Sequence, residues 1–175
     1  MKQKLPCVLL LIIVFASVSV LAQGKADEKA KNKDLLIKAT AILEQQPFHE
    51  KAKDFRSWAM AYVIQTDDVS VIVCAGDVLA PVMDKKNKYS SELLAQYTLG
   101  MAAFKLSNPD KIKDEDSAQL VGLESAIKAY EAMVKLKPKA QFAGMDDFAA
   151  KLKSGDLKKI IADAKCGTSK TEPIK

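Results

Sequence analysis

The sequence predicts an all-α fold of about six or seven helices, arranged as antiparallel helical hairpins in a small stacked array or a helical bundle. Apolar residues return every three or four positions along most of the chain, which is the spacing of one face of an α-helix. Prolines at positions 47, 109 and 138 end the periodic segments, and the links between them are short. Consecutive helices are therefore expected to lie antiparallel.

Two helices are predicted around Pro47. Before the proline, five apolar residues fall at helical spacing: Leu35, Leu36, Ala39, Ile42 and Leu43. After it, a helix is expected from about His49 to Gln65, with an apolar stripe of Ala52, Phe55, Ala59, Tyr62 and Val63. Proline does not continue a helix, so the chain turns between the two.

The segment Val69–Val73 allows two interpretations. Its sequence, Val-Ser-Val-Ile-Val, has strand propensity and alternates with period two. A longer window gives one continuous helical face, formed by Val69, Ile72, Val73, Gly76, Leu79, Ala80 and Met83. On that longer window we predict a helix from about Asp68 to Ala80, with the strand as the alternative.

Four helices are predicted in the C-terminal half. Ser90 or Ser91 is a natural N-cap for the first of them. The acidic residues 114–116 suit the positive end of the dipole of the second, and Pro138 terminates it. The four are expected at about 90–106, 117–137, 146–153 and 156–165.

The first 22 residues have the order of a secretory signal peptide. Lys2 and Lys4 precede an apolar run, and Val20-Leu21-Ala22 offers a cleavage site. An uncleaved membrane anchor is the alternative, because about 17 apolar residues is the lower limit for spanning a bilayer. We predict a cleaved leader and a secreted or periplasmic protein, without stable membrane insertion after cleavage. The predicted domains are a leader (1–22), a flexible lead-in or frayed helix start (23–34), one helical domain (35–166) and a disordered tail (167–175).

Charge and composition argue against several functions. Without the leader, 25 basic residues stand against 22 acidic ones, a net charge near +3. Arg56 is the only arginine, and arginine is the residue whose planar fork binds phosphate. We therefore expect no nucleic-acid partner. The sequence contains no Gly-rich phosphate loop or nucleotide fingerprint, so no cofactor is predicted.

Two cysteines, Cys74 and Cys166, remain after the leader is removed. An even number of cysteines in an oxidising compartment favours a disulfide, and an exposed free thiol is disfavoured there. A bridge between them would close a loop of about 92 residues and stabilise the fold by roughly 4 to 5 kcal/mol. The alternative is one buried thiol and one thiol near the tail.

The segment from Leu93 to Pro138 resembles a tetratricopeptide repeat, a helix-turn-helix unit whose small residues let two helices pack closely. Leu99-Gly100 stands where the family places its Leu-Gly pair. In the second helix, the family's small residue, aromatic residue and closing proline are matched by Ala126, Tyr130 and Pro138.

The segment also departs from the family pattern in three places. Gln96 stands at the family's tryptophan position, and Ala103 stands at its tyrosine position with Phe104 beside it. The connection from Gly100 to Ala126 is about 14 residues longer than in a standard repeat of 34. The segment is thus a repeat-like hairpin with an insertion.

The resemblance implies a protein or peptide partner, bound by the inner surface that the first helix of the hairpin forms. In this chain that helix is 91–106, and its candidate contact residues are Gln96, Tyr97 and Phe104. A second candidate patch contains Arg56, Trp58 and Tyr62, because Trp58 and Tyr62 are four apart and share a helix face. Core packing is the alternative use of these two aromatic side chains.

No catalytic or metal-binding arrangement stands out in the sequence. His49 is the only histidine and lies at the start of a helix, and zinc requires several nitrogen or sulfur ligands. Two interpretations, a calcium site or a solvated loop and helix cap, fit the acidic group of Asn108, Asp110, Asp114, Glu115 and Asp116. The cap is favoured because the calcium-loop spacing and its glycine are missing. We predict no enzyme activity and no metal.

The sequence therefore predicts a non-enzymatic helical-repeat protein that mediates protein or peptide interaction in the cell envelope. The alternative is a helical carrier that binds a lipid or small apolar ligand. Its pocket would lie between four apolar side chains: Trp58, Val73, Met101 and Phe104.

Overall fold

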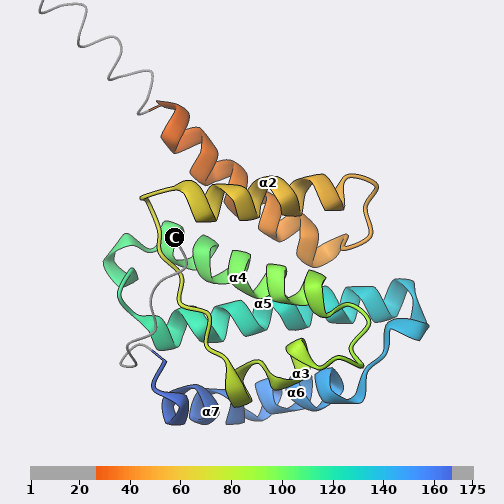
Figure 1. Cartoon of the computed structure of the whole chain (residues 1–175). Helices are drawn as coiled ribbons and strands as arrows, with labels where there is room; N and C mark the ends of the chain where they lie inside the picture. The colour runs from red at the N-terminus through yellow and green to blue at the C-terminus, as the bar shows by residue number, and fades with distance from the viewer. Residues whose placement is uncertain (1–26, 167–175) are drawn as a thin grey trace, which may run out of the picture. The chain divides into compact units, whose positions relative to one another are not determined.

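The computed structural model describes residues 27–166 (Figure 1). The predicted leader, the first residues of the lead-in and the tail at 167–175 lie outside the described residues. Within the described part every regular element is a helix and no strand is present, so the all-α prediction is confirmed. None of the described helices is both long and apolar enough to cross a bilayer.

The chain divides into two units at residue 35. In the smaller unit, residues 27–35 are helical. The larger unit starts at Leu36 and contains all the buried hydrophobic residues of the core. Its first helical segment, residues 36–45, stops before Pro47, where the sequence predicts a helix end.

Helix α2 (Ala52–Gln65) follows a turn and begins three residues after its predicted start. The delay comes from the turn itself, in which the amide of His49 donates to the carbonyl of Gln46 and the amide of Ala52 donates to the carbonyl of His49. Its core-facing residues are Ala52, Ala59 and Val63, as the apolar stripe predicts.

The helix predicted from Asp68 to Ala80 is wrong. Residues 69–75, called the strap from here on, lie outside any helix, and only η1 (Gly76–Val78) and the short α3 (Ala80–Met83) follow. Gly76 has φ of 78°, which an α-helix does not admit. Val69 and Val71 are buried while Ser70 between them is exposed, which is the alternation of an extended chain.

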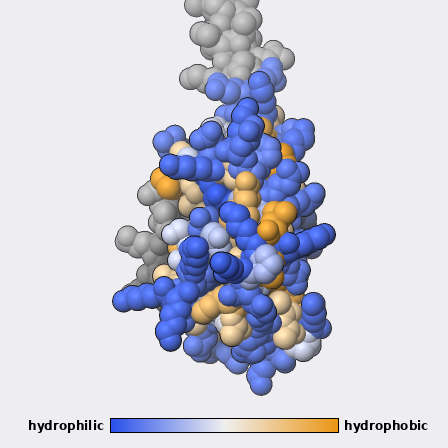
Figure 2. Space-filling model, turned by 90° about the vertical axis from the view of Figure 1, so that its right-hand side faces the viewer, coloured by the Kyte–Doolittle hydropathy of each residue, from blue (hydrophilic) through white to orange (hydrophobic). Residues whose placement is uncertain are grey.

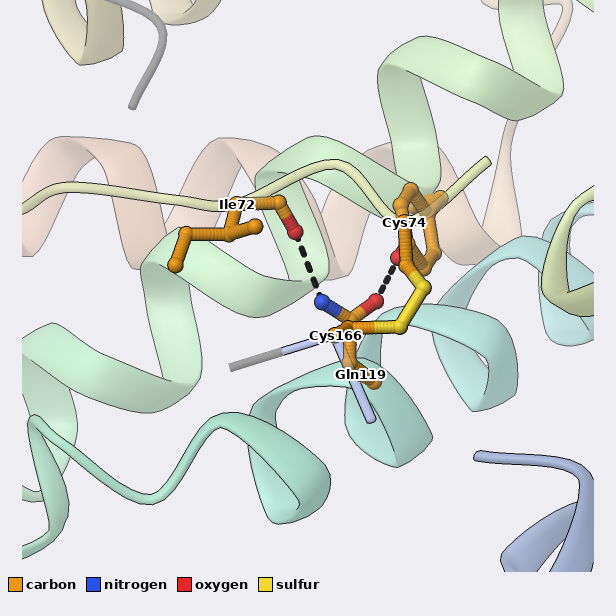
Figure 3. The surroundings of a disulfide bond; sticks show 5 residues. Ile72, Cys74, Gln119 and Cys166 are labelled. Carbon is orange, nitrogen blue, oxygen red and sulfur yellow. Dashed lines mark hydrogen bonds between the residues drawn. A yellow bond between two sulfur atoms is a disulfide. The ribbon is translucent and has the colours of Figure 1, made fainter. Parts of the chain in front are cut away.

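Side chains of other helices hold the strap in place of helical hydrogen bonds. The ammonium of Lys105 donates to the carbonyl oxygen of Ser70 over 2.9 Å. The side-chain amide of Gln119 donates to the carbonyl oxygen of Ile72 over 2.6 Å (Figure 3). Strand propensity without a partner strand therefore gives an extended segment fixed by tertiary contacts.

Helices α4 (Ser90–Ser107) and α5 (Glu115–Leu136) form the central hairpin, and both agree with the predicted helices. The single turn η2 (Pro109–Lys111) lies in the link between them. Asp114 caps α5, because its Oδ1 accepts the amide hydrogen of Ser117 over 3.1 Å. Hydrogen bonds from Ser117 lower the pKa of the Asp114 carboxyl.

The chain finishes with η3 (Pro138–Ala140), α6 (Ala143–Ser154) and α7 (Asp156–Ala164). The two predicted short helices are confirmed, and Gly155 separates them with φ of 86°. Within the larger unit, Figure 1 shows three layers: residues 36–45 with α2, then α4 with α5, then α3, α6 and α7. The central hairpin is therefore covered on two sides.

Cys74 at the end of the strap and Cys166 after α7 lie at disulfide distance, with Cα atoms 5.6 Å apart and their sulfur atoms joined (Figure 3). The hydroxyl of Tyr97 donates to Oε1 of Gln119 beside this bridge. Burial raises the pKa of Tyr97, whose side chain is fully enclosed. The bridge ties the strap to the C-terminal layer across the central hairpin.

Candidate functional site

A small groove lies where the first helical segment of the larger unit meets the central hairpin. It encloses about 290 Å³.

The walls of this groove, called the hairpin groove from here on, come from helical residues at regular spacing. Ile37 and Ala41 are four apart on the first segment, and the residues from α4 follow the spacing of one helix face. Its apolar surface therefore runs along the helix axes with polar groups between. The lining residues are Ile37, Thr40, Ala41, Glu44, Gly100, Ala103, Phe104, Ser107, Asn108 and Val121.

A hydrogen-bonded network beside the groove joins the first segment to both helices of the central hairpin. The side-chain amide of Gln96 donates to the carbonyl oxygen of Thr40 over 3.1 Å and to Oγ of Ser125 over 2.8 Å. Ser125 in turn donates to Oε1 of Glu44 over 2.6 Å. Because these buried polar groups satisfy one another, they fix the position of the groove wall.

Two glycines let α4 and α5 approach closely next to the groove. A Cβ on Gly100 would lie 2.6 Å from Cβ of Ser125, and one on Gly122 would lie 2.8 Å from the carbonyl oxygen of Tyr97. Both distances are shorter than a side chain tolerates, so glycine is required at both positions. The Leu-Gly pair that the sequence singled out thus lies at a close helix contact.

Of the three partner-contact residues predicted on α4, one is accessible to solvent and two are buried. Phe104 is partly exposed and lines the hairpin groove. Tyr97 is 0% exposed and Gln96 is 1% exposed, so the prediction that they present a surface to a partner is wrong. The reason is that α4 lies in the middle layer, where its residues from Gln96 to Ala102 are all buried.

The second predicted patch lies on α2 and does not line the groove. The rings of Trp58 and Tyr62 stack with centroids 5.8 Å apart, and both pack against the core while remaining partly exposed. Arg56 donates from Nη2 to the carbonyl oxygen of Pro47, and burial lowers the pKa of its guanidinium. The prediction that Trp58 and Tyr62 share a helix face is confirmed. Packing against the core covers part of the surface of both side chains.

Of the four residues expected to line the pocket of a carrier, Met101 lies in the core and Phe104 lines the hairpin groove. Met101 is fully buried, and its Cγ lies 2.7 Å from the position that a Cβ on Gly122 would take. Phe104 lines the hairpin groove together with other residues. Met101 therefore fills the core instead of lining a cavity.

A buried ion pair near the C-terminal end of α4 was missed in the sequence analysis. Lys105 is 2% exposed, and its ammonium contacts Oε1 of Glu115 at 2.5 Å and the strap at Ser70. The only sequence signal was a lysine on a predominantly apolar helix, and a long side chain at such a position usually extends to solvent. Glu115, which the sequence placed in an acidic cluster, is thus a partner of Lys105.

Among the described residues, no group of three or more histidine, cysteine or acidic side chains is placed to hold a metal ion. His49 is exposed, and its Nδ1 accepts the amide hydrogen of Lys51. Comparison with protein-family models, curated proteins and solved structures gives no match for this chain. The function must therefore be argued from the geometry.

Proposed function

We infer that this protein is an exported, non-enzymatic interaction protein that binds a helical segment of a partner polypeptide in the hairpin groove. The single observation that carries the proposal is the groove itself, which has apolar residues at helical spacing along two helices and polar residues at its rim. Such grooves accept the apolar face of an amphipathic helix.

The size of the groove favours a polypeptide over a carried lipid. Its volume of 290 Å³ lies at the lower limit of pockets that enclose a small molecule. It has room for a few anchoring side chains, such as two apolar residues four apart on a helix. The rest of the partner would lie along the exposed surface of residues 36–45 and the C-terminal turn of α4, where Ser107 is exposed.

Export is supported by two independent features. The N-terminal residues have the composition of a cleavable leader. Cys74 and Cys166 lie at disulfide distance, and disulfides persist mainly in oxidising compartments outside the cytoplasm. The resemblance of residues 93–138 to a tetratricopeptide hairpin agrees with a role in polypeptide binding.

The test places a large charged side chain in the groove. Ala41 is exposed and lines it, so Ala41→Arg should block binding without disturbing the core. Ala61, an exposed alanine on α2 outside the groove, gives the matched control Ala61→Arg. The tagged chain and both variants are used to capture partners from an extract of the envelope in which the protein resides.

The expected result is one polypeptide captured by the wild type and by Ala61→Arg, and lost with Ala41→Arg. Equal capture by all three, or recovery of lipid in place of a polypeptide, would contradict the proposal. Mass spectrometry of the exported chain tests export separately, and the expected N-terminus is Gln23.

A further inference from the structure

Three loops meet at one end of the larger unit, where α4 begins and α5 ends. They comprise residues 46–51, 84–89 and 135–142, and are together called the lysine end. The rings of Phe48 and Tyr89 lie 5.2 Å apart, and the ammonium of Lys137 lies 3.8 Å from the centre of the Phe48 ring. These contacts join all three loops. The lysine end is on the right in Figure 1 and faces the viewer in Figure 2.

The lysine end carries a concentrated positive charge. Seven lysines stand there against two carboxylates, Glu50 and Asp84, although the whole chain has a formal net charge of only +5. All seven lysines are exposed, and none forms an ion pair within the described part of the chain. They are Lys51, Lys85, Lys86, Lys88, Lys135, Lys137 and Lys139.

Buried polar side chains hold these loops in a fixed shape. Asn87 is 4% exposed, and its amide donates to the carbonyl oxygen of Pro81 over 3.1 Å while its Oδ1 accepts the amide hydrogen of Tyr89. With Asn87 turned inward, the neighbouring lysines are turned to solvent. Arg56 holds the loop of Phe48 in the same way through Pro47. The charges are thus presented by an ordered surface.

Apolar side chains lie between the lysines. Leu136 is 58% exposed and stands between Lys135 and Lys137 in the sequence, while Phe48 and Tyr89 are partly exposed. Figure 2 shows hydrophobic residues scattered among hydrophilic ones on this face. Lysines interleaved with aromatic and aliphatic groups suit the interface of a membrane, where the apolar parts enter the headgroup region.

We propose that the lysine end docks the protein peripherally on an anionic lipid bilayer. Charge complementarity selects the partner, because the exposed lysines face negatively charged headgroups. The exposed apolar groups distinguish a bilayer from a soluble polyanion, which offers them no apolar environment. The exposed charges of this surface are lysine ammonium groups, and the only arginine of the sequence, Arg56, donates from Nη2 to the carbonyl oxygen of Pro47, so the surface is not rich in the planar forks that bind phosphates of nucleic acids.

The test measures binding of the full chain to vesicles of phosphatidylcholine with and without 30% phosphatidylglycerol, by flotation. The variant Lys85→Gln/Lys86→Gln/Lys88→Gln removes three charges from one loop. The control Lys111→Gln/Lys158→Gln/Lys159→Gln removes three exposed lysines near the opposite end of α5. All variants keep the same N-terminus, so any contribution from that segment cancels in the comparison.

Binding should require phosphatidylglycerol and weaken with salt. The loop variant should bind roughly 100-fold more weakly and the control nearly as well as wild type, since each lysine near an anionic surface contributes about a factor of five. Equal losses in both variants, or binding that ignores phosphatidylglycerol, would overturn the proposal. So would equal or tighter binding to heparin, which would indicate a soluble polyanion as the partner.

Discussion

Reduction of the Cys74–Cys166 bridge should lower the stability of the fold by a large, calculable amount. The bridge closes a loop with a sequence separation of 92 residues, for which the chain-entropy relation gives about 4 to 5 kcal/mol. This is a substantial part of the roughly 5 to 15 kcal/mol that stabilises a typical domain. At about 2 to 4 °C per kcal/mol, the melting temperature should fall by about 8 to 20 °C.

Urea unfolding with and without dithiothreitol measures this loss directly. The slope of the unfolding free energy against urea should also rise on reduction, because the unfolded chain becomes more extended without the crosslink. The variant Cys74→Ala/Cys166→Ala, which has no bridge to reduce, should be insensitive to dithiothreitol and serves as the control. A midpoint that reduction leaves unchanged would refute the reasoning and point to two unlinked thiols.

Two further substitutions test the packing and the polar contacts of α5. Gly122→Ala would put a methyl group 2.8 Å from the carbonyl oxygen of Tyr97. The cost of overpacking, about 1 to 3 kcal/mol, should exceed the gain in helix propensity of up to about 1 kcal/mol, so the free energy of unfolding should fall. Urea unfolding should show a lower midpoint, and a higher one would disprove the close contact. Burial and the hydrogen bond to Asp146 raise the pKa of Tyr130 to about 12, so its stabilising effect is present below pH 10 and is lost as the pH rises through 12. Tyr130→Phe should lower the free energy of unfolding by about 1 to 2 kcal/mol at neutral pH, and the variant should lose less stability than the wild type between pH 10 and 12. If the variant and the wild type lose stability equally over this range, the role given to the Tyr130 hydroxyl is wrong.

Local signals predicted most of the helices. The start of α5 follows from its cap Asp114 and its end from Pro138, which act within one turn of the chain. The predicted serine cap of α4 is wrong, because α4 begins at Ser90 after Tyr89 and has no side-chain cap. The strap was mispredicted because its periodicity fits both a helix and an extended chain. The choice depended on hydrogen bonds from Lys105 and Gln119, which are distant in sequence.

The candidate site was predicted only in part. The sequence identified Phe104 and the small residue Gly100, both of which line the hairpin groove. It placed Gln96 and Tyr97 on the same accessible surface, although both are buried. Helical periodicity identifies which residues share a face, but it does not say how many faces the neighbouring layers cover.

The sequence by itself determined that the chain is helical and where most helices stop, because spacing, caps and prolines act through the local backbone. Only the tertiary structure decided that α4 is enclosed, that the strap is extended and that three lysine-bearing loops meet at one end. These features depend on contacts between residues far apart in the chain. Their energies are set by packing and burial, which a local pattern does not contain.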